Sequence, residues 1–354
     1  MADAGRLLEP ILALHERIRD AVLDACTRQA SELLAAVASD AAGGGDTIYA
    51  IDRVGEETLV EGLAELARQE PLCLVAEGLP GDGLVLPRGA RERDCRWRLL
   101  VDPIDGTRGL MYQKRSAWIL TGIAPNRGAE TRLRDTVLAV QTEIPLVKQH
   151  LSDQLWALRG RGMEARRLNR LSGAREPLTL RPSRADTIEH GFATVVRFFP
   201  GARDTLAAID DEVVQALVQP TAGRAACFED QYASTGGELY ELIAGHDRLI
   251  ADLRPLVQPV RAASGLPPGL CCHPYDLCTA LIALESGVIV REPGGAPLDA
   301  PFDVTSDVAW VGYANERLRA LVEPVLQGAL RRRGLLPPGG PTADPSDDSA
   351  ARLR

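Results

Sequence analysis

The pattern of apolar and polar residues predicts both helices and strands in the first third of the chain. Apolar residues recur at helical spacing over residues 7–37, which predicts one long helix before a glycine run. Two short apolar runs, 72–76 and 97–101, are typical of buried strands. Glu77 follows the first run and Asp102 follows the second. The pattern therefore predicts two strands that each present an acid at the carboxyl end.

The same alternation continues through the rest of the chain and predicts an α+β fold. A second helix carries Asp52 and Glu56 on one face, and Asp46 with Thr47 can cap its start. After residue 334, proline, glycine, aspartate and serine predominate, which predicts a disordered tail. Further strands are predicted at 116–123, 136–141, 193–198, 248–251 and 287–291, and further helices at 204–218, 236–244, 276–286 and 315–332.

Composition excludes several classes of protein. Hydrophobic residues make up 45% of the 354 residues and charged residues 25%, as in a soluble globular enzyme. The formal net charge of -9 argues against binding of a nucleic acid polymer, which needs a basic face. No apolar run approaches the length of a membrane span, and the start lacks the apolar stretch of a signal peptide. We therefore expect a cytoplasmic protein without a membrane or nucleic acid partner.

Cysteines offer a competing metal site. Cys271, Cys272 and His273, with Cys278 nearby, have residue types that bind zinc. Adjacent cysteines cannot easily both bind one tetrahedral ion, however, and no second pair has the spacing of a zinc ribbon. We expect the seven cysteines of the chain to be reduced thiols.

The segment D-P-I-D-G-T at 102–107 is the strongest chemical signal in the sequence. Two carboxylates and the intervening Ile104 carbonyl are predicted to lie on a tight turn at a strand end. Magnesium prefers such oxygen ligands. Gly106 lets the backbone come close to a ligand, and a helix that begins near Thr107 would offer its free amides to a phosphate.

These motifs resemble the inositol monophosphatase family of magnesium-dependent, lithium-sensitive phosphatases. In that family a Glu ends one strand, D-P-[IL]-D-G-T ends the next, and a later W-D opens a helix. The corresponding residues here are Glu77, the segment 102–107, and Asp276 after Tyr275. The resemblance covers roughly residues 7–325.

The resemblance implies a five-layer α-β-α-β-α sugar-phosphatase fold. Residues 1–165 would form an N-terminal metal-binding lobe, residues 166–333 a C-terminal α/β lobe that completes the active site, and residues 334–354 a disordered tail. It also implies two or three magnesium ions, a small phosphorylated metabolite as substrate, and a homodimer. Glu77, Asp102, the Ile104 carbonyl, Asp105 and Asp276 would bind the metal.

The remaining roles concern water and substrate. By resemblance, Thr107 with Asp52 helps to activate the attacking water and Glu77 assists as a base, while the Gly106 and Thr107 amides hold the phosphate. Arg108 replaces the usual Asn and is expected to contact substrate. Asp252 falls about where inositol enzymes place a Glu that binds a hydroxyl group, before an inserted loop at 254–272.

The substrate stays open at this point. An inositol monophosphate or another sugar phosphate is the first hypothesis, and a 3'(2'),5'-bisphosphate nucleotidase or a fructose-1,6-bisphosphatase-type activity is the alternative. A third hypothesis is a family member without catalytic activity. A haloacid-dehalogenase phosphatase would need its two acids two residues apart, whereas Asp102 and Asp105 are three apart.

Overall fold

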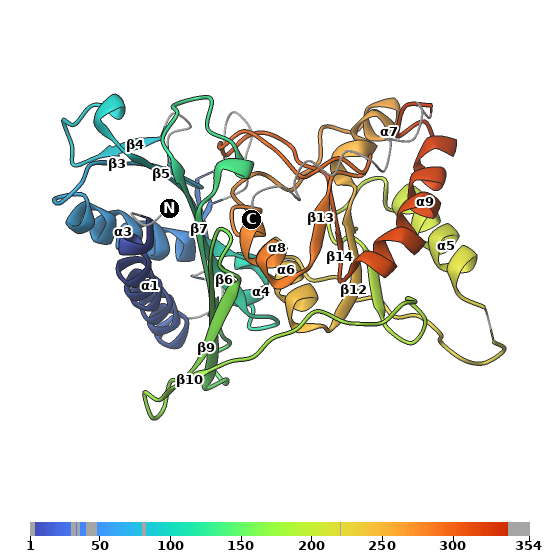
Figure 1. The fold of residues 1–354 in the computed structure, drawn as a ribbon, viewed down its shortest axis with the longest axis horizontal. Helices are drawn as coiled ribbons and strands as arrows, with labels where there is room; N and C mark the ends of the chain where they lie inside the picture. Colours follow the sequence, from blue (N-terminus) through green and yellow to red (C-terminus); the bar gives the residue numbers. More distant parts are fainter. Residues whose placement is uncertain are drawn as a thin grey trace.

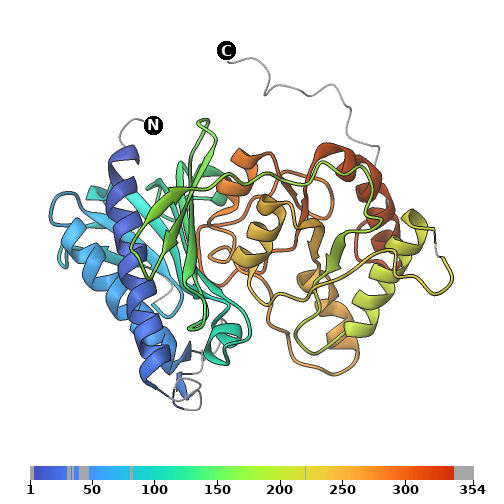
Figure 2. The same ribbon diagram turned by 90° about the horizontal axis from the view of Figure 1, so that it is seen from below.

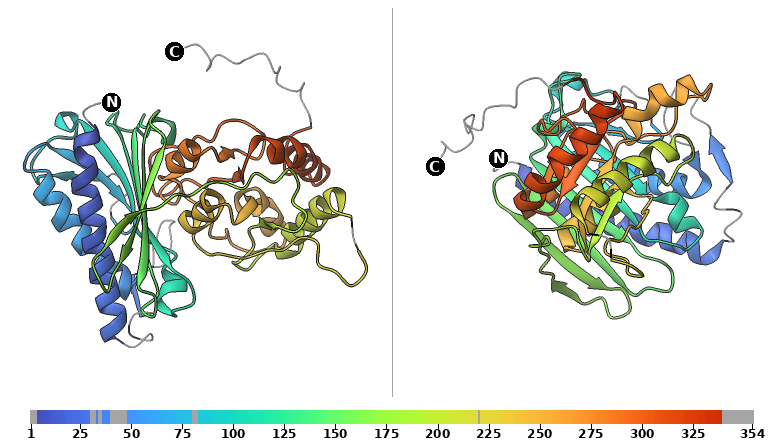
Figure 3. Two further views of the ribbon diagram at one scale, coloured as in Figure 1. Left: turned by 60° about the horizontal axis from the view of Figure 1, so that its bottom comes forward. Right: turned by 90° about the vertical axis from the view of Figure 1, so that its right-hand side faces the viewer.

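The structure is a computed structural model that describes residues 4–29, 33, 36–39, 48–79, 83–219 and 221–338. It has five layers in the order helix, sheet, helix, sheet, helix (Figure 1). An outer helical layer packs on a large sheet, a middle layer fills the space between two sheets, and a third layer covers the small sheet (Figures 2 and 3). The expected five-layer fold is therefore confirmed. From the outer layer on the large sheet to the layer on the small sheet, the helices are α1 (Leu8–Arg28) and α3 (Ala50–Leu66), then α6 (Thr235–Ala244) and α8 (Ala280–Ser286), then α5 (Arg203–Leu217) and α9 (Glu316–Arg332).

The large sheet has eight strands in the order β10-β9-β8-β7-β6-β5-β3-β4. All neighbours are antiparallel except β3 and β5, which run parallel, so their carboxyl ends meet at one edge. Both strands are buried along their whole length, since helices cover both faces of the sheet. The strands are β3 (Leu72–Ala76), β4 (Leu84–Leu86), β5 (Trp97–Asp105), β6 (Ala117–Pro125), β7 (Leu138–Ile144), β8 (Leu151–Leu158), β9 (Met163–Asn169) and β10 (Arg175–Pro177). The boundary expected at residue 165 thus falls inside β9.

The small sheet has the order β11-β12-β14-β13. Its strands are β11 (Phe192–Val195), β12 (Asp247–Asp252), β13 (Ile289–Arg291) and β14 (Trp310–Tyr313). Two hydrophobic cores follow from this layering. One lies between α1, α3 and the large sheet, and the other surrounds α6, α8 and the small sheet. Burial on both faces of the large sheet holds β5, which carries the candidate site, in a fixed position.

Shorter elements complete the chain. They are the strands β1 (Val37–Ser39) and β2 (Ile48–Tyr49), the helices α4 (Thr107–Met111) and α7 (Gln258–Ala263), and the 3₁₀ turns Ala4–Leu7, Glu92–Asp94, Leu133–Asp135 and Arg254–Val257. The described residues include no helix that combines the length and apolar character needed to cross a membrane.

Two predicted helices have different bounds in the structure. The helix expected over 7–37 ends at Arg28, because Gln29 is extended (φ -115°, ψ 146°) and Val37–Ser39 pairs as β1 with β2. The helix expected from Asp276 begins at Ala280, because the Asp276 carboxylate accepts a hydrogen bond from the His273 amide (2.6 Å) and holds a turn there. The predicted caps at 46 and 47 and the glycine run at 43–45 lie outside the described residues.

Candidate active site

A β-bulge shapes the 102–107 segment. Asp102 pairs with Leu120 of β6 and Asp105 pairs with Trp118, so β5 advances three residues where β6 advances two. Side chains of a regular strand alternate between faces, and a spacing of three would separate the two carboxylates. The one extra residue restores them to the same face. The strand therefore does not end at residue 101 as predicted but continues to Asp105, and Pro103, which cannot donate to the sheet, fits at the bulge.

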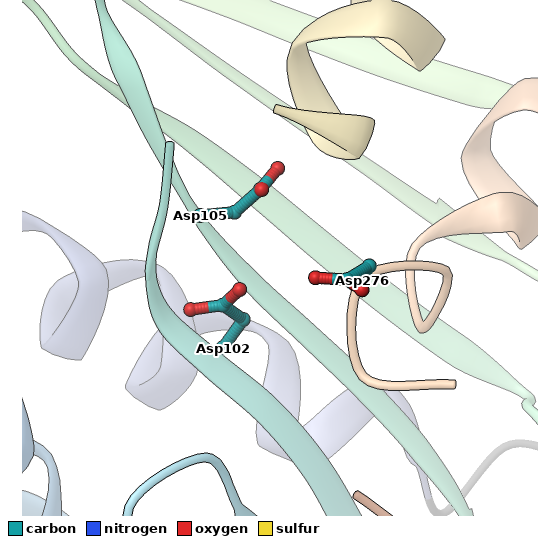
Figure 4. Close-up of side chains that lie close together, drawn as sticks. All are labelled: Asp102, Asp105 and Asp276. Atoms are coloured by element: carbon teal, nitrogen blue, oxygen red, sulfur yellow. The ribbon is translucent and has the colours of Figure 1, made fainter. Parts of the chain in front are cut away.

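Three aspartates converge at this point. One carboxylate oxygen of each of Asp102, Asp105 and Asp276 lies within 4.8 Å of the other two, with Asp276 on the turn before α8 (Figure 4). Asp102 and Asp105 are buried and Asp276 is partly buried. Burial, followed by the negative charges of Glu77, Asp105 and Asp276, raises the pKa of Asp102 well above its ordinary value. Clustered carboxylate oxygens that repel one another fit a hard divalent cation such as magnesium.

The amino end of α6 holds Asp105. The Ser234 hydroxyl donates to Asp105 Oδ2 (2.7 Å), and the Gly236 amide donates to the same oxygen (2.6 Å). Ser234 also accepts from the Gly237 amide (2.9 Å) and so caps the helix. Burial and the charge of Asp276 raise the pKa of Asp105 to about 7, while the hydrogen bonds from Ser234 and Gly236 act in the opposite direction. These α6 residues were not among the predicted site residues, although a serine before a glycine pair and an apolar run is a readable helix start.

Thr107 connects the aspartate cluster to α3. Its hydroxyl lies 2.7 Å from Asp52 Oδ1 and 2.7 Å from the Ile104 carbonyl, and its single proton serves one of them at a time. Asp52 also accepts from the Tyr49 amide (2.7 Å) at the start of α3. Gly106 precedes α4 with φ +95°, and a Cβ there would lie 3.0 Å from Ser234 Cβ, so both conformation and space favour glycine.

Nearly all of the predicted site residues line one pocket. It encloses about 570 Å³, including the space at its open mouth. Glu77 lies on its wall and accepts a hydrogen bond from the Tyr275 hydroxyl (3.2 Å). The predicted residues that line the pocket are Asp52, Glu77, Asp102, Ile104, Asp105, Gly106, Thr107, Arg108 and Asp276.

Asp252 is the exception. Its side chain is fully buried and is not part of the pocket wall, because its carboxylate pairs with Arg254 (2.5 Å). Arg254 lines the pocket in its place. Phe198 and Phe199, between β11 and α5, line it as well and were also missed from the sequence.

The cysteine alternative finds no support. Cys271, Cys272 and Cys278 are buried free thiols. Within the described ranges, the one group of three or more histidine, cysteine, aspartate or glutamate residues with metal-binding geometry is the aspartate cluster.

Comparisons of the sequence find no matching family model and no matching curated protein. Solved structures do match. A Pyrococcus horikoshii protein with similarities to inositol-1 monophosphatase is 14% identical, with a TM-score of 0.58 over 92% of this chain and 99% of its own. Leishmania major fructose-1,6-bisphosphatase is 12% identical, with a TM-score of 0.64 over 92% and 94%. The suppressor protein SuhB of Bartonella henselae is 15% identical, with a TM-score of 0.60 over 91% and 98%.

The chain has the inositol monophosphatase fold. The matches span more than nine tenths of the chain, so both sheets and all three helical layers belong to the shared inositol monophosphatase architecture. At identities of 12 to 15% the likeness establishes the fold, and function has to be argued from the residues of this chain.

Proposed function

We propose that the chain is a magnesium-dependent phosphomonoesterase that releases phosphate from a small phosphorylated metabolite. The observation that carries this proposal is the convergence of Asp102, Asp105 and Asp276, with one oxygen of each within 4.8 Å of the others, in the wall of one pocket. Acids that repel one another in a buried position raise the free energy of the metal-free protein, and a bound cation reverses that effect.

Magnesium ligands would come from two strands and one turn. Asp102 and Asp105 of β5, Asp276 before α8, Glu77 after β3 and the Ile104 carbonyl would hold two or three ions. A bound magnesium ion supplies charge neutralisation at a phosphate and lowers the pKa of water. The fold positions these oxygens before any ion arrives, because α6 fixes Asp105 and the bulge fixes Asp102 beside it.

The attacking water would be oriented by Thr107. When the Thr107 hydroxyl donates its hydrogen bond to Asp52, its oxygen can still accept a hydrogen bond from the attacking water. Asp52 is itself held by the Tyr49 amide, so the hydroxyl has a fixed direction. Glu77 would then take up the proton as a general base, with Tyr275 restraining one of its oxygens.

The phosphate would bind at the turn between β5 and α4. Gly106 is the N-cap of α4 and Thr107 is its first residue, where the backbone amides have no partner within the helix. The absence of a Cβ at Gly106 lets a phosphate oxygen approach those amides. Because water is the attacking group, no phosphorylated protein intermediate would form. A homodimer and a cytoplasmic location remain expectations from the sequence.

A phosphate-release assay tests this proposal. The protein is incubated with magnesium and a panel that includes inositol 1-phosphate, sugar phosphates and 3'-phosphoadenosine 5'-phosphate. We expect magnesium-dependent release that Asp105→Asn abolishes without loss of the folded state, as judged by circular dichroism. Full activity in excess chelator would refute the metal-dependent reaction, and silence across the panel would favour a non-catalytic protein.

A further inference from the structure

One wall of the pocket is cationic and aromatic. The Arg108 guanidinium lies 5.0 Å from the centre of the Phe199 ring, and the Arg254 guanidinium lies 5.4 Å from the same centre. Arg254 also lies 4.6 Å from the centre of the Phe198 ring. All four side chains line the pocket that holds the aspartate cluster. Because both guanidinium groups lie beside the same ring, they are at most about 10 Å apart.

The hydrogen bonds that Arg254 makes within the described residues use three of its five N–H donors. Asp252 accepts from Nε (2.9 Å) and from Nη2 (2.5 Å), and the Leu270 carbonyl accepts from Nη1 (3.3 Å). A guanidinium has five N–H donors, one on Nε and two on each Nη. Within the described part of the chain, one donor on Nη1 and one on Nη2 therefore remain. These two donors, called here the Arg254 fork, can each donate to an oxygen of a phosphate or carboxylate.

The surroundings hold this fork rigidly. Arg254 is 7% exposed and Asp252 is 0% exposed, so the pair is fixed by burial as well as by its hydrogen bonds. Glu238, the other acid nearby, is also buried, and its pKa is raised well above the usual range by burial and by the charge of Asp252. The acid that bonds directly to the Arg254 guanidinium is Asp252. A prearranged donor pair binds an anion with little loss of side-chain entropy.

We propose that the substrate carries a second anionic group, a phosphate or a carboxylate, which the Arg254 fork and Arg108 bind while the first phosphate lies at the aspartate cluster. This inference rests on the proposed function and narrows its substrate class. Arg254 becomes a specificity-determining residue. Asp252, expected from the sequence to contact substrate, instead acts as a positioning residue that orients Arg254.

The test compares substrates that differ in their second group. The kcat/KM for fructose 1,6-bisphosphate and for 3-phosphoglycerate is divided by that for inositol 1-phosphate, whose remaining groups are neutral hydroxyls. For the wild type, this ratio is expected to exceed one for at least one of the two substrates that carry a second anionic group. The substrate with the larger ratio shows whether that second group is a phosphate or a carboxylate. Arg254→Lys keeps the charge but removes the fork, and it should lower that ratio about 10- to 100-fold.

A second variant separates recognition from folding. The double substitution Asp252→Asn with Arg254→Gln removes both charges together, so no unpaired charge is left buried. It should lower the ratio at least as much as Arg254→Lys. Arg261→Lys is the matched control, because Arg261 bonds to the Pro200 and Pro267 carbonyls outside the pocket and its change should leave the ratio as it was. Phosphate release with an unchanged ratio in both Arg254 variants overturns this inference alone. No release from any substrate overturns the proposed function, and the inference with it.

Discussion

Replacement of Asp276 by Asn should stabilise the metal-free protein and remove its response to magnesium. Two unit charges 4.8 Å apart repel by about 3.5 kcal/mol at an effective dielectric constant of 20. Asp276 is partly exposed, so screening by water reduces its repulsion from the Asp105 carboxylate to about 2 kcal/mol. The Asn side-chain oxygen can still accept the hydrogen bond from the His273 amide, so the turn is preserved. The free energy of unfolding without metal should therefore rise by about 2 kcal/mol.

Urea unfolding in excess chelator and in excess magnesium measures both effects. The assay is best performed at about pH 8.5, because the Asp105 pKa of about 7 leaves that carboxylate ionised there. Magnesium should stabilise the wild type and not Asp276→Asn. Asp299→Asn is the matched control. Asp299 forms an ion pair with Arg132 (2.6 Å), so its charge is stabilised by a cation, whereas the charge of Asp276 is repelled by its neighbouring aspartates. That variant should lose stability and keep the magnesium response. A metal-free Asp276→Asn protein less stable than the wild type, with its magnesium response intact, would refute the reasoning.

Three further predictions follow from single contacts. Thr107→Val should lower kcat about 100-fold in the phosphate-release assay, because it removes the hydroxyl that bonds to Asp52. Thr107→Ser keeps the hydroxyl and should retain most of the wild-type kcat. Equal kcat values for the Val and Ser variants would show that the hydroxyl has no part in the reaction. Gly236→Ala should cost about 1 to 3 kcal/mol of unfolding free energy and weaken magnesium binding measured by calorimetry, because its Cβ would lie 2.5 Å from Leu120 Cδ2 and 2.9 Å from Asp105 Oδ2. Gly294→Ala, with open space around the new Cβ, should do neither. Burial lowers the pKa of His15 to about 3, so the unfolded chain binds this proton first and stability should fall as pH drops from about 6.5 toward 3, by up to about 5 kcal/mol in urea titrations. His15→Gln should have a shallower slope over that range, and an unchanged slope would contradict this assignment.

Local patterns predicted much of the fold. The run 72–76 forms β3 with the bounds expected, because a short apolar run between turn residues is typical of a strand buried on both faces. The helices expected at 204–218 and 315–332 form as α5 and α9, within one residue at each end. In α9 the start is fixed by the Asn315 side chain, which accepts a hydrogen bond from the Leu318 amide (3.0 Å). Signals of this kind lie within a few residues and can be read without knowledge of the fold.

Features that depend on distant pairings could not be predicted in this way. The bulge between Asp102 and Asp105 is a property of the register between β5 and β6, and the sequence of β5 alone suggested a turn at Pro103. The contact between Ser234 and Asp105 joins residues 129 positions apart. The position of Asp252 was predicted near the site, but its role depends on the side chain of Arg254 folding back onto it. In each case the missing information is three-dimensional.

The aspartate cluster also explains why the core around β5 has to be so fully buried. Each close pair of carboxylates opposes folding by about 2 to 3.5 kcal/mol, a large share of the roughly 5 to 15 kcal/mol by which domains are stable. Hydrogen bonds from the start of α6 offset part of this cost at Asp105, and burial of apolar residues on both faces of the large sheet also favours folding. A substitution that loosens that packing, such as Leu100→Ala within β5, should therefore reduce magnesium-free stability more than magnesium-bound stability. Equal losses in the two states would mean that the cluster and the core are energetically independent, which the shared strand argues against.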